Sequence, residues 1–190
     1  MGRSKALLPV PGGETFLSRI VRTLLDGGAD DVVVVLGHEA DLIAQHVEVT
    51  RLPARVVVNS AYETGQLSSV LAGLNAIDRP GVRALMLTLV DIPLVASATV
   101  RAVIERYRAT GASVVRPVRG NEHGHPVIVD RSLFAPVRAA GPAHGAKPII
   151  RAHVSAAGDV AVTDEGAFLD IDTPDEYARA FGVQLPIRVS

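Results

Sequence analysis

The stretch from Ala84 to Val95, Ala-Leu-Met-Leu-Thr-Leu-Val-Asp-Ile-Pro-Leu-Val, constrains the fold of this chain more than any other. Seven largely apolar residues lead to Asp91, and Pro93 then stops the strand. A continuous apolar run of this length is typical of a strand buried on both faces, as in a parallel sheet covered by helices. Open α/β sheets place ligands at the carboxyl ends of such strands. Asp91 is therefore a candidate site residue, although a single aspartate at such a position more often serves only to cap a turn.

Strand-like and helical patterns alternate along most of the chain. Strand-like runs occupy residues 32–36, 55–59, 84–90, 113–118, 127–129 and 160–162. Apolar residues at helical spacing predict helices over 15–25, around 43–47, and over 66–74, 97–107, 133–137 and 149–153, with a last one from Thr173. Thr173 is its predicted N-cap and Pro174 its first residue. This alternation predicts an α/β sheet sandwiched by helices.

The composition is that of one globular domain. The chain has 190 residues, of which 48% are hydrophobic and 21% charged, and such a length buries roughly 70% of the unfolded surface. We find no repeat and no clear linker, which predicts a single domain over residues 1–190.

Charge and residue usage exclude several classes of function. The net charge of −1 provides no electrostatic footprint for nucleic acid. No apolar run approaches the length of about 20 residues that spans a bilayer. Because cysteine is absent, there is no disulfide framework, thiolate nucleophile or cysteine-based zinc site. We therefore expect a cytoplasmic protein.

Two segments could serve a polar ligand. The opening residues 1–13 are rich in glycine, proline and basic side chains and are predicted to form a loop, with Lys5 either in a site or simply solvated. A second polar loop ends at Gly65, where a helix begins with Ser68 and Ser69 in or near its first turn. Free backbone N–H groups and hydroxyls there suit a polar ligand, although both serines can also be ordinary first-turn residues.

Three aspartates, Asp91, Asp170 and Asp172, stand at the ends of apolar runs. Two carboxylates that meet in space bind a hard divalent cation, typically magnesium held together with phosphates and water. His123 and His125 are spaced like a metal pair, but no third ligand has a diagnostic spacing, so the indication of zinc is weak. The chain has no Gly-x-Ser-x-Gly elbow, Walker loop or Gly-x-Gly-x-x-Gly motif, and these absences leave serine hydrolase, P-loop and dinucleotide-binding functions without support.

Five segments, in this order along the chain, resemble motifs of the MobA-like nucleotidyltransferases. They are residues 2–17, residues 59–74 with the run Tyr62-Glu-Thr-Gly-Gln-Leu-Ser-Ser69, residues 89–94, residues 124–127 and residues 170–177. The third segment is similar to a Pro-x-Asp-x-Pro metal motif, with Leu89 in the usual proline position. The resemblance is closest to the molybdenum cofactor cytidylyltransferase branch.

This resemblance implies a Rossmann-like three-layer sandwich with a mixed, mostly parallel sheet, of the nucleotide-diphospho-sugar transferase type. It also implies transfer of CMP from CTP to the phosphate of a molybdopterin cofactor with release of pyrophosphate, and a molybdenum hydroxylase as a potential partner. The alternatives are a guanylyltransferase that uses GTP, a transferase acting on sugar or polyol phosphates, and a catalytically silent relative that binds cofactor.

The resemblance assigns roles to individual residues of this chain. It implies that Lys5 and Asp91 are catalytic. It also implies that Asp91 and Asp172 bind Mg²⁺, with Asp170 as the alternative second ligand. His125 faces the acceptor. Nucleotide binding falls to a group of four residues in the second segment, namely Asn59, Gly65, Ser68 and Ser69.

One departure from the family concerns the start of the chain. Family members begin with a hydrophobic strand, a small-residue phosphate loop and an arginine, whereas this sequence begins at the Met-Gly that follows them. The missing strand would lie at the centre of the sheet, so we expect the natural protein to begin upstream of Met1. Loss of the phosphate loop would also fit a silent relative, while the presence of Lys5 and Asp91 counts against one.

Overall fold

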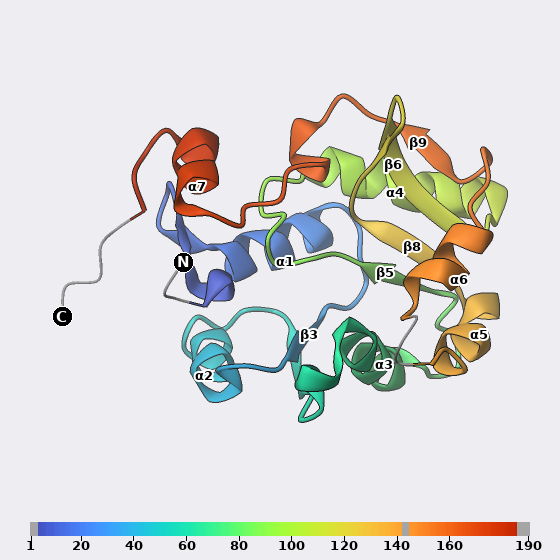
Figure 1. Ribbon diagram of the computed structural model, residues 1–190, viewed down its shortest axis with the longest axis horizontal. Coiled ribbons are helices and arrows are strands. Elements are labelled where there is room, and N and C mark those ends of the chain that lie inside the picture. The colour runs from blue at the N-terminus through green and yellow to red at the C-terminus, as the bar shows by residue number, and fades with distance from the viewer. Residues whose placement is uncertain (1–3, 142–144, 186–190) are drawn as a thin grey trace.

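The computed structural model describes residues 4–141 and 145–185, in which helices and strands alternate (Figure 1). The helices are α1 (Phe16–Asp26), α2 (Ala40–Val49), α3 (Gln66–Ile77), α4 (Ser97–Thr110), α5 (Phe134–Arg138), α6 (Lys147–Ala152) and α7 (Pro174–Phe181). The strands are β1 (Pro9–Val10), β2 (Glu14–Thr15), β3 (Val33–Leu36), β4 (Arg55–Val58), β5 (Ala84–Leu87), β6 (Val114–Arg119), β7 (Glu122–His123), β8 (Val127–Asp130) and β9 (Asp159–Ala161). Short 3-10 turns are η1 (Lys5–Leu7), η2 (Tyr62–Thr64), η3 (Arg131–Leu133) and η4 (Glu165–Ala167). The predicted α/β class is confirmed.

The strands of the described residues form three sheets. β3 and β4 pair in parallel, and β1 and β2 form a small antiparallel hairpin. In the largest sheet, β8 lies antiparallel between β5 and β6, β7 continues from β6 as a hairpin, and β9 pairs with β6 in parallel. Parallel and antiparallel pairs both occur, which confirms the mixed sheet.

Local interactions fix the two ends of helix α1 and the start of helix α7. Thr15 caps α1 by accepting a hydrogen bond from the Ser18 N–H, and a buried apolar face follows. At the end of α1, Gly27 lies against α4, since a Cβ atom at this position would come within 2.4 Å of Val100. The predicted start of α7 is also confirmed, because Thr173 and Glu176 form a capping box.

The apolar run in front of Asp91 differs from its predicted structure. The strand β5 ends at Leu87, so Asp91 lies four residues beyond it in a turn rather than at its last residue. All four residues of β5 are only partly buried, whereas the pattern predicted burial on both faces. The physical reason is that β5 pairs along one edge, with β8, and has no strand beside its other edge in the described residues.

Two segments predicted as loops contain regular structure. Within the opening segment, where residues 1–3 lie outside the described residues, the chain forms η1 and the β1–β2 hairpin. The turn-like segment before Pro126 contains β7. Both structures are only two or three residues long, and sequence periodicity does not reveal elements of that length. Other predicted elements differ from the observed ones at their ends.

A cluster of aromatic and aliphatic side chains joins the two ends of the described chain. Its buried members are Leu8, Val10, Phe16, Ile171 and Tyr177. The rings of Phe16 and Tyr177 are stacked with centroids 6.2 Å apart. In Figure 1, α7 accordingly lies beside the N-terminal segment and α1. Within residues 4–141 and 145–185, no helix has the length and apolar character needed to cross a membrane.

Candidate active site

Lys5 joins two carboxylates that are far apart in the sequence. Its Nζ lies 3.4 Å from Asp91 Oδ2 and also donates to Asp172 Oδ1. Partial burial by itself lowers the pKa of Lys5, but the hydrogen bond and charge of Asp172, with the charge of Asp91, outweigh burial and raise the pKa. Lys5 is therefore a full positive charge between two carboxylates.

The two carboxylates meet because a backbone hydrogen bond joins their segments. The Ile171 N–H donates to the Asp91 carbonyl at 2.8 Å. Ile171 is fully buried in the cluster with Phe16 and Tyr177, so its side chain anchors this bond. Residues on either side of Ile171 are then held beside Asp91.

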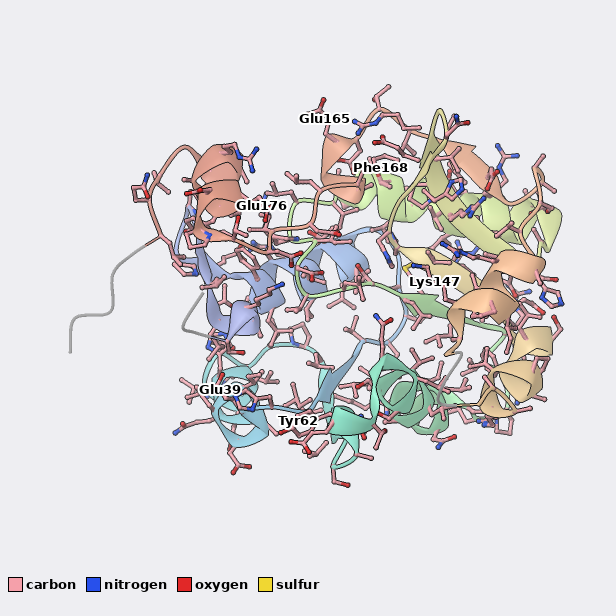
Figure 2. The ribbon with its side chains drawn as sticks, in the orientation of Figure 1. Glu39, Tyr62, Lys147, Glu165, Phe168 and Glu176 are labelled. Carbon is pink, nitrogen blue, oxygen red and sulfur yellow. The ribbon has the colours of Figure 1, made fainter. Side chains whose placement is uncertain are left out.

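The start of α7 supports the same segment. The Glu176 carboxylate accepts from the backbone N–H groups of Asp172 and Thr173 at 2.8 and 2.9 Å. Glu176 is seen at this position in Figure 2. These bonds hold the backbone of Asp172 while its side chain stays 56% exposed, which leaves the carboxylate accessible to a ligand.

Asp170 stands close to the same charges but does not pair with Lys5. Partial burial raises the pKa of Asp170, and the negative charges of Asp91 and Asp172 raise it further. Three carboxylates therefore share this corner with one lysine. The contacts favour Asp172 over Asp170 as the partner of Asp91 in holding a cation.

A second group of predicted residues is centred on Asn59. Its side chain is 6% exposed and donates to Ser68 Oγ at 2.8 Å and to Ser69 Oγ at 3.0 Å. Its Oδ1 accepts from the Ala61 N–H, so each end of the amide is used. Asn59 thus fixes the first turn of α3 relative to the end of β4.

The helix start itself depends on Gly65. This residue has φ of +114°, a conformation that L side chains rarely adopt, and it directly precedes α3. Its carbonyl accepts from Ser68 Oγ at 2.8 Å. Ser68 is therefore occupied as both donor and acceptor, whereas the Ser69 hydroxyl is seen only to accept.

His125 follows the β6–β7 hairpin and lies near enough to Asp91 and Asp170 to feel their charges. Its backbone N–H donates to the Ala167 carbonyl at 2.8 Å, and its ring Nδ1 lies 3.4 Å from the Leu87 carbonyl oxygen. Burial lowers the pKa of His125, so its ring is neutral at pH 7. Gly124 permits this approach because a Cβ there would come within 2.3 Å of the Ala167 carbonyl oxygen. His123, in contrast, is exposed on β7.

One cavity connects these groups. It has a volume of about 1540 Å³, and its lining includes Lys5, Ser69 and His125. The structure therefore places His125 and one residue of each predicted group around one space, although the described residues form no direct hydrogen bond between the two groups.

The carboxylate pair fits a divalent cation. Asp91 Oδ1 is buried and has no hydrogen-bond partner in the described residues, and Asp91 and Asp172 already converge on the Lys5 ammonium. The described residues contain no cluster of three or more metal-binding side chains, histidines included. Two carboxylates with the remaining positions left to phosphate and water are typical of magnesium rather than zinc.

The sequence did not indicate Thr88 as a site residue, and it left Asp170 as an alternative to Asp172. Thr88 Oγ1 is buried without a hydrogen-bond partner in the described residues, and the residue lines the cavity. It lies inside the apolar run, where no local pattern distinguishes it. Asp170 was weighed only as an alternative to Asp172, and its repulsion by both other carboxylates became visible only in the tertiary structure.

Comparison with known proteins agrees with this fold and shows that the chain is a nucleotidyltransferase. The chain belongs to the MobA-like NTP transferase family, whose domain profile matches residues 1–157.

Two relatives show the range of the family. Nicotine blue oxidoreductase of Paenarthrobacter nicotinovorans is 31% identical over 94% of this chain and 89% of its own length. A probable molybdenum cofactor guanylyltransferase of Mycobacterium tuberculosis is also 31% identical, over 65% of this chain and 58% of its own length. This chain thus spans less than two thirds of the guanylyltransferase.

Among solved structures, Rv0371c from Mycobacterium tuberculosis H37Rv superposes with a TM-score of 0.75 and 28% identity. The match covers 96% of this chain and 91% of that one. A structure of the same protein in complex with manganese superposes with a TM-score of 0.72 at 27% identity, and covers 96% and 94% of the two chains. A homologous structure therefore binds a divalent metal.

Proposed function

We propose that this protein is a cytoplasmic cytidylyltransferase that transfers CMP from CTP to the terminal phosphate of a molybdopterin-type cofactor and releases pyrophosphate. The product would then serve a molybdenum hydroxylase. GTP is the alternative donor, and the guanylyltransferase among the relatives supports it.

The convergence of Asp91 and Asp172 on Lys5 Nζ carries this proposal. Both reactants are polyanions, so a site for their reaction must hold positive charge beside carboxylates that can bind a divalent cation. The same cavity is lined by Lys5 and Ser69, which places the start of α3 within the same space.

The chemistry is an in-line displacement at the α-phosphorus of the nucleotide. An oxygen of the acceptor phosphate forms a bond to that phosphorus, and the bond to the bridging oxygen breaks with departure of pyrophosphate. Lys5, a compact and mobile charge, leaves the carboxylates and contacts a phosphate oxygen. Positioning and charge compensation then provide most of the acceleration, because phosphoryl chemistry needs little covalent help from the protein.

Magnesium held by Asp91 and Asp172, when bound, would offset charge on the leaving pyrophosphate. In its absence Lys5 is the cation between these carboxylates. The raised pKa of Lys5, which results from its carboxylate partners against the opposing effect of burial, keeps that side chain protonated.

The remaining residues act on the two substrates. Asn59 holds Ser68 and Ser69 at the start of α3, and we assign this turn, with Gly65, to the base and ribose of the nucleotide. Free N–H groups at a helix start favour polar and anionic ligands. His125, which is neutral and lines the cavity near Asp91 and Asp170, is assigned to the acceptor.

Isothermal titration of CTP and of GTP, each with and without magnesium, tests the proposal. We expect CTP to bind more tightly than GTP and both to need the metal, followed by pyrophosphate release when molybdopterin is added. A preference for GTP would transfer the assignment to a guanylyltransferase. Failure to bind either nucleotide would contradict it.

Because one relative is an oxidoreductase, the same titration should also include nicotinamide cofactors. NADH and NADPH should show no saturable binding to this protein. Binding of a nicotinamide cofactor without binding of CTP or GTP would overturn the transferase proposal.

A further inference from the structure

Two segments beside the candidate metal site, residues 87–91 and 167–171, are tied together at both ends. At one end, the backbone N–H of His125 donates to the first carbonyl of 167–171 at 2.8 Å, and its ring Nδ1 lies 3.4 Å from the first carbonyl oxygen of 87–91. At the other end, the Ile171 N–H donates to the Asp91 carbonyl at 2.8 Å. The two segments therefore run side by side in the same direction, from His125 to the carboxylates of the site.

Side chains of both segments alternate between the core and the surface. Leu89 and Phe168 pack against the main hydrophobic core. The residues that follow them, Val90 and Leu169, are 37% and 38% exposed although both are large and apolar. Each directly precedes an aspartate of the candidate site. Val90 and Leu169, which we call the apolar pair, thus place exposed apolar surface beside the carboxylates.

The aromatic ring next to the apolar pair is already covered. Phe168 follows η4 directly (Figure 2), and the guanidinium carbon of Arg119 lies 4.8 Å from the centroid of the Phe168 ring. Glu122 holds Arg119 there, since its carboxylate accepts from the Arg119 Nε at 2.8 Å. A Cβ atom at Gly124 would come within 3.0 Å of the same ring. Apolar surface for a ligand beside the carboxylates is therefore provided by the apolar pair and not by Phe168.

The position of the apolar pair suits the acceptor rather than the nucleotide base. Val90 lines the cavity together with Lys5 and His125, and His125 is the residue assigned to the acceptor. The base and ribose are assigned to the turn at the start of α3, which belongs to the group centred on Asn59. An acceptor phosphate at the metal position would bring its organic part next to the apolar pair.

We propose that Val90 and Leu169 determine acceptor specificity by contact with an apolar face of the acceptor, and that they favour a phosphate monoester of a flat nitrogen heterocycle over a polyol phosphate. This inference rests on the proposed function, because it concerns the acceptor of the same reaction. Burial of apolar side chains against a ring is favourable, whereas polyol hydroxyl groups would lose water there without gaining hydrogen bonds. The carboxylate of Asp170, next to Leu169 in the chain, can accept from N–H groups at the edge of such a ring.

Binding of two phosphate monoesters, with manganese and without nucleotide, tests this proposal. The probes are 6-hydroxymethylpterin phosphate, followed by its fluorescence, and glycerol 3-phosphate, followed by calorimetry. We expect the pterin to bind at least about tenfold more tightly, the effect of about two buried methylene groups. Val90→Ser and Leu169→Ser should each weaken pterin binding by about fivefold, since one buried methylene group contributes about fourfold to affinity. Neither substitution should change the affinity for glycerol 3-phosphate.

Leu42→Ser and Val49→Ser are the matched controls, because both residues are exposed apolar side chains on α2, and they should leave pterin binding unchanged. Leu169→Met should retain binding, since methionine has an apolar side chain of similar size. Equal affinities of the two probes, unchanged pterin affinity in Val90→Ser and Leu169→Ser, or equal losses in the controls would overturn the proposal. Lack of saturable pterin binding would overturn it as well. Because this titration contains no nucleotide, failure of CTP to bind would contradict the proposed function alone.

Discussion

The N–H of Ile171 donates a hydrogen bond of 2.8 Å to the carbonyl of Asp91, across 80 residues of sequence. Ile171 is fully buried, and Asp172 beside it shares Lys5 with Asp91. The contact therefore determines which carboxylate lies opposite Asp91.

Substitution Asp91→Asn should lower transfer by about a hundredfold or more, the loss seen when a key electrostatic group is removed from a site. The bond to Ile171 uses the backbone carbonyl, so the fold should be retained. Turnover with saturating CTP and magnesium, beside a circular dichroism spectrum, measures both. Near-normal turnover would end the assignment of Asp91 to the metal.

Asp172 and Asp170 provide a matched pair of substitutions for testing the second metal ligand. Asp172→Asn should weaken manganese binding by about tenfold or more, which corresponds to about 1.4 kcal/mol, because Asp172 shares the Lys5 cation with Asp91. Asp170→Asn should weaken it less, since Asp170 has no bond to Lys5. Titration of manganese by electron paramagnetic resonance distinguishes the two, and the reverse order would make Asp170 the second ligand.

Lys5→Ala should weaken binding of CTP, dCTP and GTP alike by about ten- to a hundredfold, the scale of about 1.5–3 kcal/mol for a hydrogen bond to a charged group. Base preference should not change, because Lys5 is assigned to phosphate. Lys147, the other lysine of the chain, lies on α6 and lines the same cavity, so its substitution tests whether any lysine charge there has the same effect (Figure 2). A loss confined to one base, or an equal loss in Lys147→Ala, would contradict this role.

Substitutions of Ser68 and Ser69 should have different effects, one on the free energy of unfolding and the other on nucleotide binding. Ser68 donates to the Gly65 carbonyl and accepts from Asn59, so Ser68→Ala should cost about 1 kcal/mol of unfolding free energy. Ser69 lines the cavity and is seen only to accept, so Ser69→Ala should mainly weaken nucleotide binding. Urea denaturation and calorimetric titration of both variants measure the two effects. Equal nucleotide affinity in both would remove Ser69 from the site.

A pH-dependent effect on stability is expected at the Tyr107 hydroxyl. It donates to Asp130 Oδ2 at 2.6 Å, and burial together with this bond raises the pKa of Tyr107 to about 12. Partial burial alone raises the pKa of Asp130, but hydrogen bonds from Ser132 and Tyr107 outweigh burial and lower the pKa. A lowered pKa in the folded state stabilises the protein above the unfolded value of about 3.9, and this contribution is lost as pH falls through the folded value.

Tyr107→Phe should therefore destabilise the protein at pH 7 by about 1–2 kcal/mol, the scale of a hydrogen bond to a charged group. The difference from the unmodified protein should shrink as pH falls below about 4, where the Asp130 carboxylate is protonated. Thermal unfolding of both proteins between pH 7 and pH 3.5 measures this difference. A difference that stayed constant over the whole range would show that the charge of Asp130 is not involved.

Part of the local structure of this chain could be predicted from its sequence. The N-cap of α7 at Thr173, with Pro174 as the first residue, and the start of α3 after Gly65 each depend on residues only a few positions apart. Such interactions form wherever the local sequence allows them. The mixed α/β class followed for the same reason, since it rests on the alternation of two periodicities. The roles of the individual site residues came from resemblance of their motifs to a family.

Tertiary structure alone decided how those residues meet. No pattern in the sequence reveals that Asp172 rather than Asp170 pairs with Lys5, because that choice depends on the hydrogen bond of Ile171 to Asp91 and on the burial of Ile171 against Phe16. β5 was predicted to run up to Asp91 and ends at Leu87, since a strand extends only as far as a neighbour pairs with it. Contacts between distant segments exist only after the chain has packed, and packing is a property of the whole molecule.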